Sequence, residues 1–155
     1  MMTEAEAKEI IERCGTMIID NPVELRLLCY EIAEHFVDSG VEAVVGADRS
    51  GIHIARWVAY HLSTQKKVDE RTLAFRAEKT RNGQFIFELG GAIKYLPGRK
   101  TLVVEETLTR GSRELIEATR AIGADVIGLG ALCNRGIIRL KDVVNPPKMF
   151  ALVNK

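Results

Sequence analysis

The sequence predicts an α/β fold, a mostly parallel sheet with helices on both faces. Apolar runs with the length of buried strands alternate along the chain with segments whose apolar residues recur at helical spacing, a pattern typical of strands joined by crossover helices. Three of the predicted strands end in polar turns, which in such a sheet meet at one edge. The chain has no internal repeat, and we expect residues 1–155 to form one domain.

The composition favours a soluble, cytoplasmic protein. The chain has 155 residues, 46% of them hydrophobic, and its 22 Lys and Arg against 21 Asp and Glu give a formal charge of +1. A net charge this close to zero gives no electrostatic indication that the protein binds nucleic acid or a membrane. The first residues are acidic and polar, and no apolar run approaches the ~18 residues of a membrane span. Cys14, Cys29 and Cys133 lack metal-ligand spacing, so we expect buried thiols in a reducing cytosol.

Two helices are predicted before the first strand. Thr3 and Glu6 have capping-box spacing, which predicts a helix over residues 3–14. Asn21 as a cap and Pro22 in the first turn predict the start of a second helix. Its apolar residues recur at helical spacing and form the expected buried stripe: Leu25, Leu28, Cys29, Ile32 and Phe36.

A strong strand is predicted over residues 41–45, followed by a polar turn. Residues 46–51 begin and end with glycine and hold Asp48 and Arg49 between them, and a helix is expected from Ile52. The backbone N–H groups of such a turn, together with an arginine, could meet a phosphate group. The alternative is a tight strand-to-helix turn with an ion pair on the surface.

A charged hairpin is predicted next. Residues 72–75 and 84–87 are strand-like, and the turn between them, residues 76–83, carries three cations within six residues. These cations are Arg76, Lys79 and Arg81. We interpret the segment as a positively charged flap, with an exposed hairpin tip as the alternative.

Residues 101–122 carry the strongest indication of a ligand site. The apolar run 102–104 ends at Glu105 and Glu106, residues 107–112 form a polar turn, and a helix follows. The free N–H groups at a helix N-terminus favour an anion such as phosphate. Carboxylates are strong acceptors for hydroxyl groups. The sequence therefore predicts a ligand that carries both hydroxyls and phosphate.

Two further strands complete the predicted sheet. Residues 126–133 form a buried strand that ends in a polar turn, residues 134–136. Residues 149–153, after a pair of prolines, are expected at a sheet edge. The chain has no P-loop, no Gly-x-Gly-x-x-Gly after a strand and no Gly-x-Ser-x-Gly elbow, which argues against kinase-like, dinucleotide-binding and serine-hydrolase functions.

The remaining polar residues resemble the type I phosphoribosyltransferases. Residues 102–112 look like that family's signature for phosphoribosyl pyrophosphate (PRPP), an apolar strand followed by two acids and a Thr/Gly turn. In order along the chain, residues 46–51 resemble the family's pyrophosphate loop and residues 76–83 its flexible catalytic flap. Residues 134–136 resemble the Asp-Arg turn of the orotate branch. The resemblance extends over roughly residues 22–136.

The resemblance implies Mg²⁺-dependent transfer of phosphoribose between PRPP and a nitrogenous base, with release of pyrophosphate. The base would be orotate or a related pyrimidine or purine, as in pyrimidine biosynthesis and other nucleotide metabolism. The resemblance also implies a β-hairpin flap, a reduced N-terminal hood and a homodimer. Mg²⁺ would be held by PRPP, with Glu105 as a candidate protein ligand.

Individual roles follow from the same resemblance. Glu105 and Glu106 would hold the ribose hydroxyls, Lys79 with Arg76 would close over the pyrophosphate, and Arg135 would meet the base. These four groups near the reacting atoms, Lys79, Arg76, Glu105 and Glu106, are the expected catalytic residues. PRPP binding is expected of two segments and their side chains: Asp48, Arg49, Ser50, Glu105, Glu106, Thr107, Leu108, Thr109, Arg110, Gly111, Ser112 and Arg113.

The phosphate turn departs from the family pattern. Four residues differ from those usual there: Glu106 replaces Asp, Arg110 replaces Thr, Ser112 replaces Gly, and Arg113 replaces Ser or Thr. Arg113 could supply a charge in place of a hydroxyl, or it could block the turn. These departures favour an alternative, a catalytically impaired regulatory protein of the same fold that binds PRPP or a nucleotide. An α/β domain for an unrelated phosphate ligand is the third possibility.

Overall fold

The computed structural model of the chain describes residues 1–64, 66–88, 91–136 and 143–154. Within these residues the strands form one sheet of six, in the order β3-β2-β1-β4-β5-β6. All neighbouring strands pair in parallel except β2 and β3, which are antiparallel. The bounds are β1 Ala43–Ala47, β2 Leu73–Lys79, β3 Phe85–Phe87, β4 Lys100–Leu108, β5 Asp125–Asn134 and β6 Lys148–Asn154. The predicted mostly parallel sheet is confirmed, with β6 at its edge.

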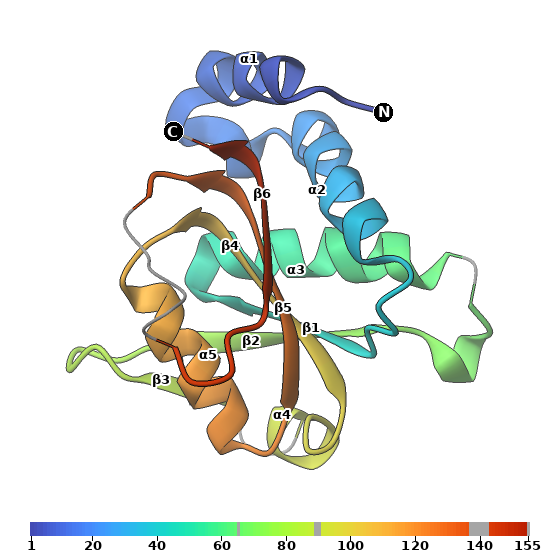
Figure 1. Ribbon diagram of the computed structural model, residues 1–155, viewed down its shortest axis with the longest axis vertical. Coiled ribbons are helices and arrows are strands. Elements are labelled where there is room, and N and C mark those ends of the chain that lie inside the picture. The colour runs from blue at the N-terminus through green and yellow to red at the C-terminus, as the bar shows by residue number, and fades with distance from the viewer. Residues whose placement is uncertain (65, 89–90, 137–142, 155) are drawn as a thin grey trace.

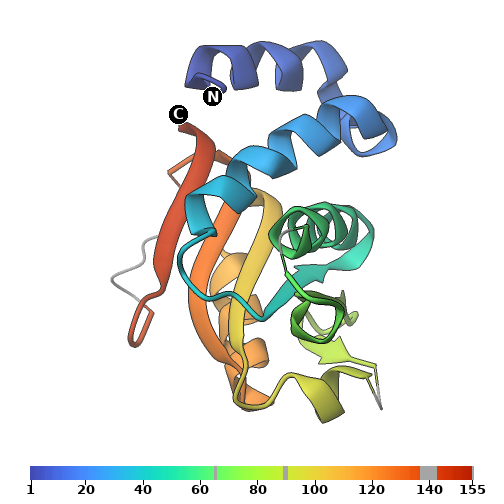
Figure 2. The same cartoon turned by 90° about the vertical axis from the view of Figure 1, so that its right-hand side faces the viewer.

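Helices cover both faces of this sheet, as predicted (Figures 1 and 2). Helices α2 and α3 pack on one face, and α5 packs on the other together with the short α4. Helix α1 lies beyond α2 and contacts β6. The helix bounds are α1 Glu4–Cys14, α2 Pro22–Phe36, α3 Asp48–Ser63, α4 Gly91–Tyr95 and α5 Gly111–Ala121, and short 3₁₀ segments span Gly15–Asp20 and Val68–Glu70.

The sheet separates two apolar cores because successive side chains of a strand point to opposite faces. On β4, Leu102 and Val104 pack against α2 and α3, whereas Val103 packs on the α5 side. Strand β5 has glycine at positions 128 and 130, where α2 lies closest. A Cβ on Gly128 would come within 2.6 Å of the Phe36 ring, so these glycines allow the helix to approach the sheet.

The predicted starts of the first two helices are correct, but one cap is not. Thr3 and Glu6 make the reciprocal hydrogen bonds of a capping box at α1. Asn21 precedes α2 as expected, yet its side chain does not cap that helix and instead donates to the Met17 carbonyl oxygen. The predicted apolar stripe of α2 is buried in full, which anchors this helix on the sheet.

Two strands are longer than the sequence indicated. Residues 76–79, predicted as part of a turn, belong to β2, where Ala77 pairs with Ala47 of β1. Residues 105–108, predicted to follow the strand, belong to β4, where Thr107 pairs with Cys133. Both predicted strands ended at the first polar side chains. The strands in the structure continue, because the hydrogen bonds between strands are made by backbone groups and can form beside polar side chains.

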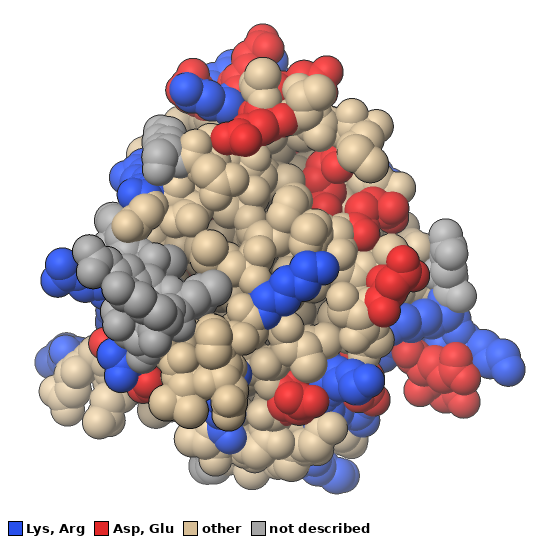
Figure 3. Space-filling view, in the orientation of Figure 1, with Lys and Arg blue, Asp and Glu red and all other residues tan. Residues whose placement is uncertain are grey.

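The surface has no single dominant charge on the face that Figure 3 shows. Basic and acidic side chains are interspersed around its rim, and the middle of this face is mostly uncharged (Figure 3). None of the described helices is both long and apolar enough to cross a membrane. Cys29 and Cys133 are buried as predicted, whereas Cys14 is only half-buried.

Candidate active site

A cavity of about 290 Å³ lies at the carboxyl edge of the sheet, between the ends of β1 and β4. From β1 the chain crosses to β2 on one side, whereas β4 and β5 lie on the other, so the cavity is at the point where the strand order reverses. Ligands of open α/β sheets bind at such switch points. The cavity is lined by Ala47, Asp48, Ser50, Gly51, Lys79, Phe85, Glu105, Glu106, Thr107, Thr109 and Gly111.

The turn after β1 is tighter than predicted. Helix α3 begins at Asp48 rather than Ile52, so the strand passes into the helix almost directly. A Cβ on Gly46 would lie 2.0 Å from the Gly51 carbonyl oxygen, so only glycine fits there. Asp48 has a φ of 53°, a left-handed conformation that is strained for a residue other than glycine. Strain of this kind is concentrated at functional sites.

Asp48 also connects this turn to the hairpin. Its Oδ1 accepts a hydrogen bond of 2.9 Å from the Lys79 backbone N–H. Ser50 lines the cavity beside it, but Arg49 does not. The Arg49 side chain is largely exposed and lies 3.7 Å from Asp20. The structure therefore brings Asp48 and Ser50 to the cavity, while the predicted basic residue of this turn points to the surface.

Of the two hairpin cations that were expected to be catalytic, one lines the cavity. Lys79 and Arg76 are three residues apart on β2, and an odd separation places side chains on opposite faces of a strand. Lys79 lines the cavity, with its Nζ 5.8 Å from the centre of the Phe85 ring. Arg76 instead pairs with Glu78 at 3.1 Å.

The two predicted acids both line the cavity, and burial weakens their acidity. Burial raises the pKa of Glu105 to about 7, although the Ser112 hydroxyl and the Lys79 ammonium act in the opposite direction. Burial also raises the pKa of Glu106, and the positive charge of Arg135 partly opposes this effect. Ligand hydroxyls could replace the hydration that both carboxyls lose on burial.

In the turn between β4 and α5, side-chain hydroxyls accept hydrogen bonds from backbone N–H groups of the same turn. The Ser112 Oγ accepts a hydrogen bond of 3.0 Å from the Thr109 N–H and donates one to Glu105 Oε2. The Thr109 Oγ1 accepts from the Gly111 N–H at 3.2 Å. Thr109 and Gly111 line the cavity, as does Thr107, whereas Leu108 and Ser112 are buried.

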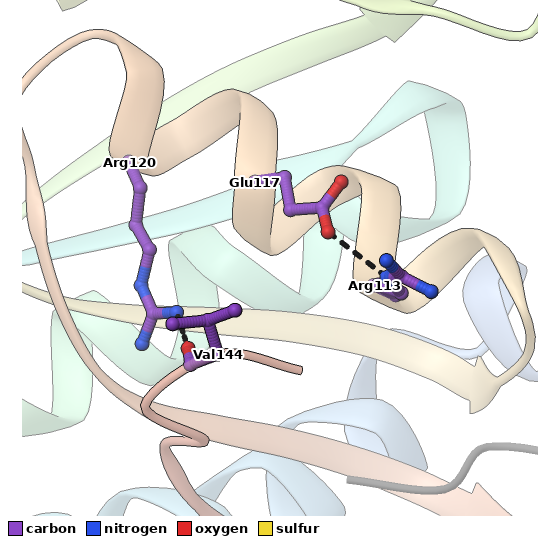
Figure 4. Close-up of polar contacts among 4 residues, drawn as sticks. All are labelled: Arg113, Glu117, Arg120 and Val144. Carbon is purple, nitrogen blue, oxygen red and sulfur yellow. Dashed lines mark hydrogen bonds and ion pairs between the residues drawn. The ribbon is translucent and has the colours of Figure 1, made fainter. Parts of the chain in front are cut away.

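The two arginines of this segment lie outside the cavity lining. Arg110 is exposed directly before α5. The Arg113 Nε pairs with Glu117 Oε1 at 2.9 Å, one helical turn further along α5 (Figure 4). This pair directs Arg113 along the helix, and Arg113 does not line the cavity.

Arg135 lies beyond the end of β5, on the Glu106 side of the site. It is exposed and does not line the cavity, but its charge reaches Glu106. The turn that holds it is stabilised by a 2.9 Å hydrogen bond from the Gly136 N–H to Asn134 Oδ1. Arg135 is therefore near the acidic pair but not part of the described cavity.

Three lining residues were not among the predicted site residues: Ala47 and Gly51, which lie in the predicted turn of residues 46–51, and Phe85. Ala47 lines the cavity because β1 extends to it. Phe85 lines the cavity because it pairs with Lys79 across the antiparallel strands, where directly opposed side chains share one face. The pairing of β2 with β3 places Phe85 at the cavity, and the sequence alone did not show which residues of the two strands are paired.

The site offers oxygen ligands without a complete metal cage. Among the described residues, no three His, Cys, Asp or Glu side chains form a cluster that could hold a metal ion. Three carboxylates do line the same cavity, those of Asp48, Glu105 and Glu106. Magnesium is usually bound through one or two carboxylates together with substrate phosphates, so this donor set fits Mg²⁺ that arrives with a phosphorylated ligand.

Comparison with known proteins gives relatives of one kind. No protein-family model matches the chain. It is 32% identical to the orotate phosphoribosyltransferase of Desulforamulus reducens over 120 residues, which are 76% of this chain and 57% of that protein. It is 29% identical to the adenine phosphoribosyltransferase of Burkholderia multivorans over 138 residues, 80% of this chain and 73% of that one. The chain thus spans little more than half the length of the first of these relatives.

Solved structures show the same fold. The orotate phosphoribosyltransferase of Mycobacterium tuberculosis in complex with PRPP matches 97% of this chain and 88% of its own, with a TM-score of 0.72 and 18% identity. The Giardia lamblia APRTase complexed with 9-deazaadenine matches 100% of this chain and 99% of its own, with a TM-score of 0.73 and 15% identity. In sequence the chain is similar to orotate and adenine phosphoribosyltransferases, and it has the fold of the solved phosphoribosyltransferases described above.

Proposed function

We propose that the protein transfers phosphoribose from PRPP to a nitrogenous base and releases pyrophosphate. The observation that carries the proposal is the convergence of Glu105, Glu106 and Lys79 in one cavity at the switch point of the sheet. The named relatives support it, because they are orotate and adenine phosphoribosyltransferases. We further propose that residues 1–155 act as one domain in the cytoplasm.

The cavity has a suitable group for each part of PRPP. Glu105 and Glu106 would accept hydrogen bonds from the ribose hydroxyls. The 5-phosphate would lie at the turn that contains Thr109 and Gly111, before the N-terminus of α5. The pyrophosphate would lie between the N-terminus of α3 and the ammonium group of Lys79.

The chemistry follows from charge. The bond from C1 to the pyrophosphate oxygen breaks with its electron pair on that oxygen, and a nitrogen of the base forms the new bond to C1. Lys79 would stabilise the negative charge on the leaving group, while the nearby carboxylates favour the positive charge that develops on the ribose. Closure of the hairpin over the cavity would exclude water, which competes with the base as acceptor.

Mg²⁺ would neutralise part of the pyrophosphate charge when it is bound with PRPP. Glu105 and Glu106 are the residues that we propose to hold it or its water ligands. Arg135 is the proposed contact for the base, since a guanidinium pairs well with a carboxylated pyrimidine such as orotate. Adenine has no carboxylate, so the same residue would discriminate against it.

Calorimetric titration of PRPP with and without Mg²⁺, followed by orotate, adenine and other bases, tests the proposal. We expect Mg²⁺-dependent PRPP binding and pyrophosphate release with one of the bases. Lys79→Ala should reduce turnover by about 100-fold or more while PRPP still binds. Lys94→Ala is a matched control, because Lys94 also lies over an aromatic ring but is outside the cavity. If PRPP does not bind to the unaltered protein, the proposed function is wrong.

The turn between β4 and α5 favours a second candidate, a regulatory protein that binds PRPP or a nucleotide without turnover. The Thr109 and Gly111 amides already donate within the turn, so fewer of its N–H groups are available to orient a bound phosphate for reaction. This candidate would be supported if PRPP bound but released no pyrophosphate with any of the bases, and if Lys79→Ala did not change the affinity for PRPP.

We also propose that the protein is a homodimer. Helices α2 and α3 expose apolar side chains around a surface cavity of about 500 Å³ that contains Trp57 and Tyr30. Soluble monomers rarely expose a large contiguous apolar patch. We therefore propose that a second copy of the chain covers this face, so that these apolar side chains are buried between two subunits.

A further inference from the structure

Ser112 occupies an unusual place between the two halves of the site. It lies in the first turn of α5 and its side chain is completely buried. Its hydroxyl accepts from the Thr109 N–H at 3.0 Å and donates to Glu105 Oε2. A buried hydroxyl needs partners, and here one partner belongs to the phosphate turn and the other to the acidic pair.

The chemistry of these two contacts restricts the residue. A hydroxyl can donate and accept at the same time, whereas glycine and alanine can do neither. The donated bond goes to a carboxylate, and hydrogen bonds to ionised groups are roughly twice as strong as neutral ones. A carboxylate has about four acceptor positions, so the Ser112 contact leaves capacity for a hydroxyl of a ligand in the cavity that Glu105 lines.

We propose that Ser112 is a positioning residue that fixes the Glu105 carboxylate against the Thr109 turn, so that the hydroxyls and the phosphate of one sugar phosphate are bound at a set separation. The preferred ligand is then a pentose 5-phosphate with a free hydroxyl for Glu105, and not phosphate alone. This inference rests on the proposed function for its ligand, but the contact that it concerns exists without ligand.

The geometry of the contact indicates how it acts. Glu105 Oε2 accepts from the Ser112 hydroxyl, while the Glu105 side chain also lines the cavity. Without that hydroxyl the carboxyl loses its hydrogen bond to α5 and can take up other rotamers.

The test is a titration of ribose 5-phosphate into the full chain at one fixed pH. Ser112→Ala should weaken binding about tenfold, since the lost bond involves an ionised group. Ser112→Cys, which keeps the volume and a weak donor, should fall between Ser112→Ala and the unaltered protein. Thr119→Val is the control, because Thr119 is a buried hydroxyl on the same helix that donates to Leu115 outside the cavity.

A double-mutant cycle separates positioning from general damage. In a Glu105→Ala background, Ser112→Ala should change the affinity for ribose 5-phosphate less than twofold, because the side chain that it orients is absent. An equal loss in both backgrounds would overturn the proposal.

A measurement without ligand separates this inference from the proposed function. A crystal structure of Ser112→Ala should show the Glu105 carboxyl displaced from the Thr109 turn, and Thr119→Val should leave it in place. If Glu105 moves in this way but no sugar phosphate binds to the unaltered protein, the Ser112 contact stands and the proposed function is wrong. If the Glu105 carboxyl keeps its place without the Ser112 hydroxyl, the positioning role is refuted.

Discussion

At the scale of single residues, Glu105 is a partly buried carboxyl that lines the cavity. Its pKa is about 7 in the folded chain against an ordinary value of 4.5, so the folded state holds a proton that the unfolded state has lost between these values. Stability therefore declines as the pH rises from about 4.5 through 7 and is level above that range.

This sign gives a pH-dependent prediction for Glu105→Gln. The variant should be more stable than the unaltered protein at pH 8, by about 2 kcal/mol, and nearly equal to it at pH 4.5. Urea unfolding at both pH values measures the difference, with the exposed Glu9→Gln as control. An equal effect of Glu105→Gln at the two pH values would contradict the assigned cause.

Gly46 is a second residue with a sharp structural requirement. In Gly46→Ala the new methyl group would overlap the Gly51 carbonyl, so β1 and α3 would have to separate. We expect a loss of about 3 kcal/mol in the free energy of unfolding and a loss of ligand binding at the same turn. Gly91→Ala is the control, because a Cβ there would meet its nearest neighbour, the Phe75 ring, at 3.9 Å. Equal stability of both variants would argue against the close approach.

At the scale of elements, the contact between α2 and β5 depends on matched large and small residues. Phe36 lies over Gly128, with only 2.6 Å between its ring and the position of a Cβ on that glycine. Gly128→Ala should cost about 2 kcal/mol because the helix must move away from the sheet. Phe36→Leu removes part of the ring, so the double variant should lose less than the sum of the two single losses. Strictly additive free energies of unfolding would show that the two residues do not compete for space.

The β2–β3 hairpin shows the same dependence on pairing. Of its predicted cations, Lys79 lines the cavity, whereas the strand period turns Arg76 away from it. The predicted flexibility of the flap stays a prediction. The Asp48 contact to the Lys79 N–H, together with Lys79 itself, makes the base of the hairpin part of the site.

At the scale of the whole molecule, the exposed face of α2 and α3 bears on assembly. Val23, Leu27, Tyr30 and Tyr60 are exposed there. If this face is the proposed dimer interface, Leu27→Glu should shift the mass measured by light scattering from two chains to one, because a buried unpaired charge is costly. Val144→Glu, at an exposed apolar residue elsewhere, is the control. A monomeric unaltered protein would refute the dimer.

The sequence by itself determined the class of fold, the order of strands and helices along the chain, and the acidic pair before a turn and helix. These features depend on local periods of polarity, capping residues and turns, which a single segment carries. The capping box at Thr3, the buried stripe of α2 and the edge strand β6 are examples that the structure confirms.

Only the tertiary structure decided which of the expected residues share one cavity. Arg49, Arg110 and Arg113 are close in sequence to lining residues, yet each points elsewhere, whereas Phe85 enters through its pairing with Lys79. Ser112 turns from a ligand contact into a buried link between Glu105 and Thr109. The physical reason is that strand register, helix phase and the packing of α5 on the sheet set the direction of each side chain, and these arise from contacts between segments far apart in the sequence.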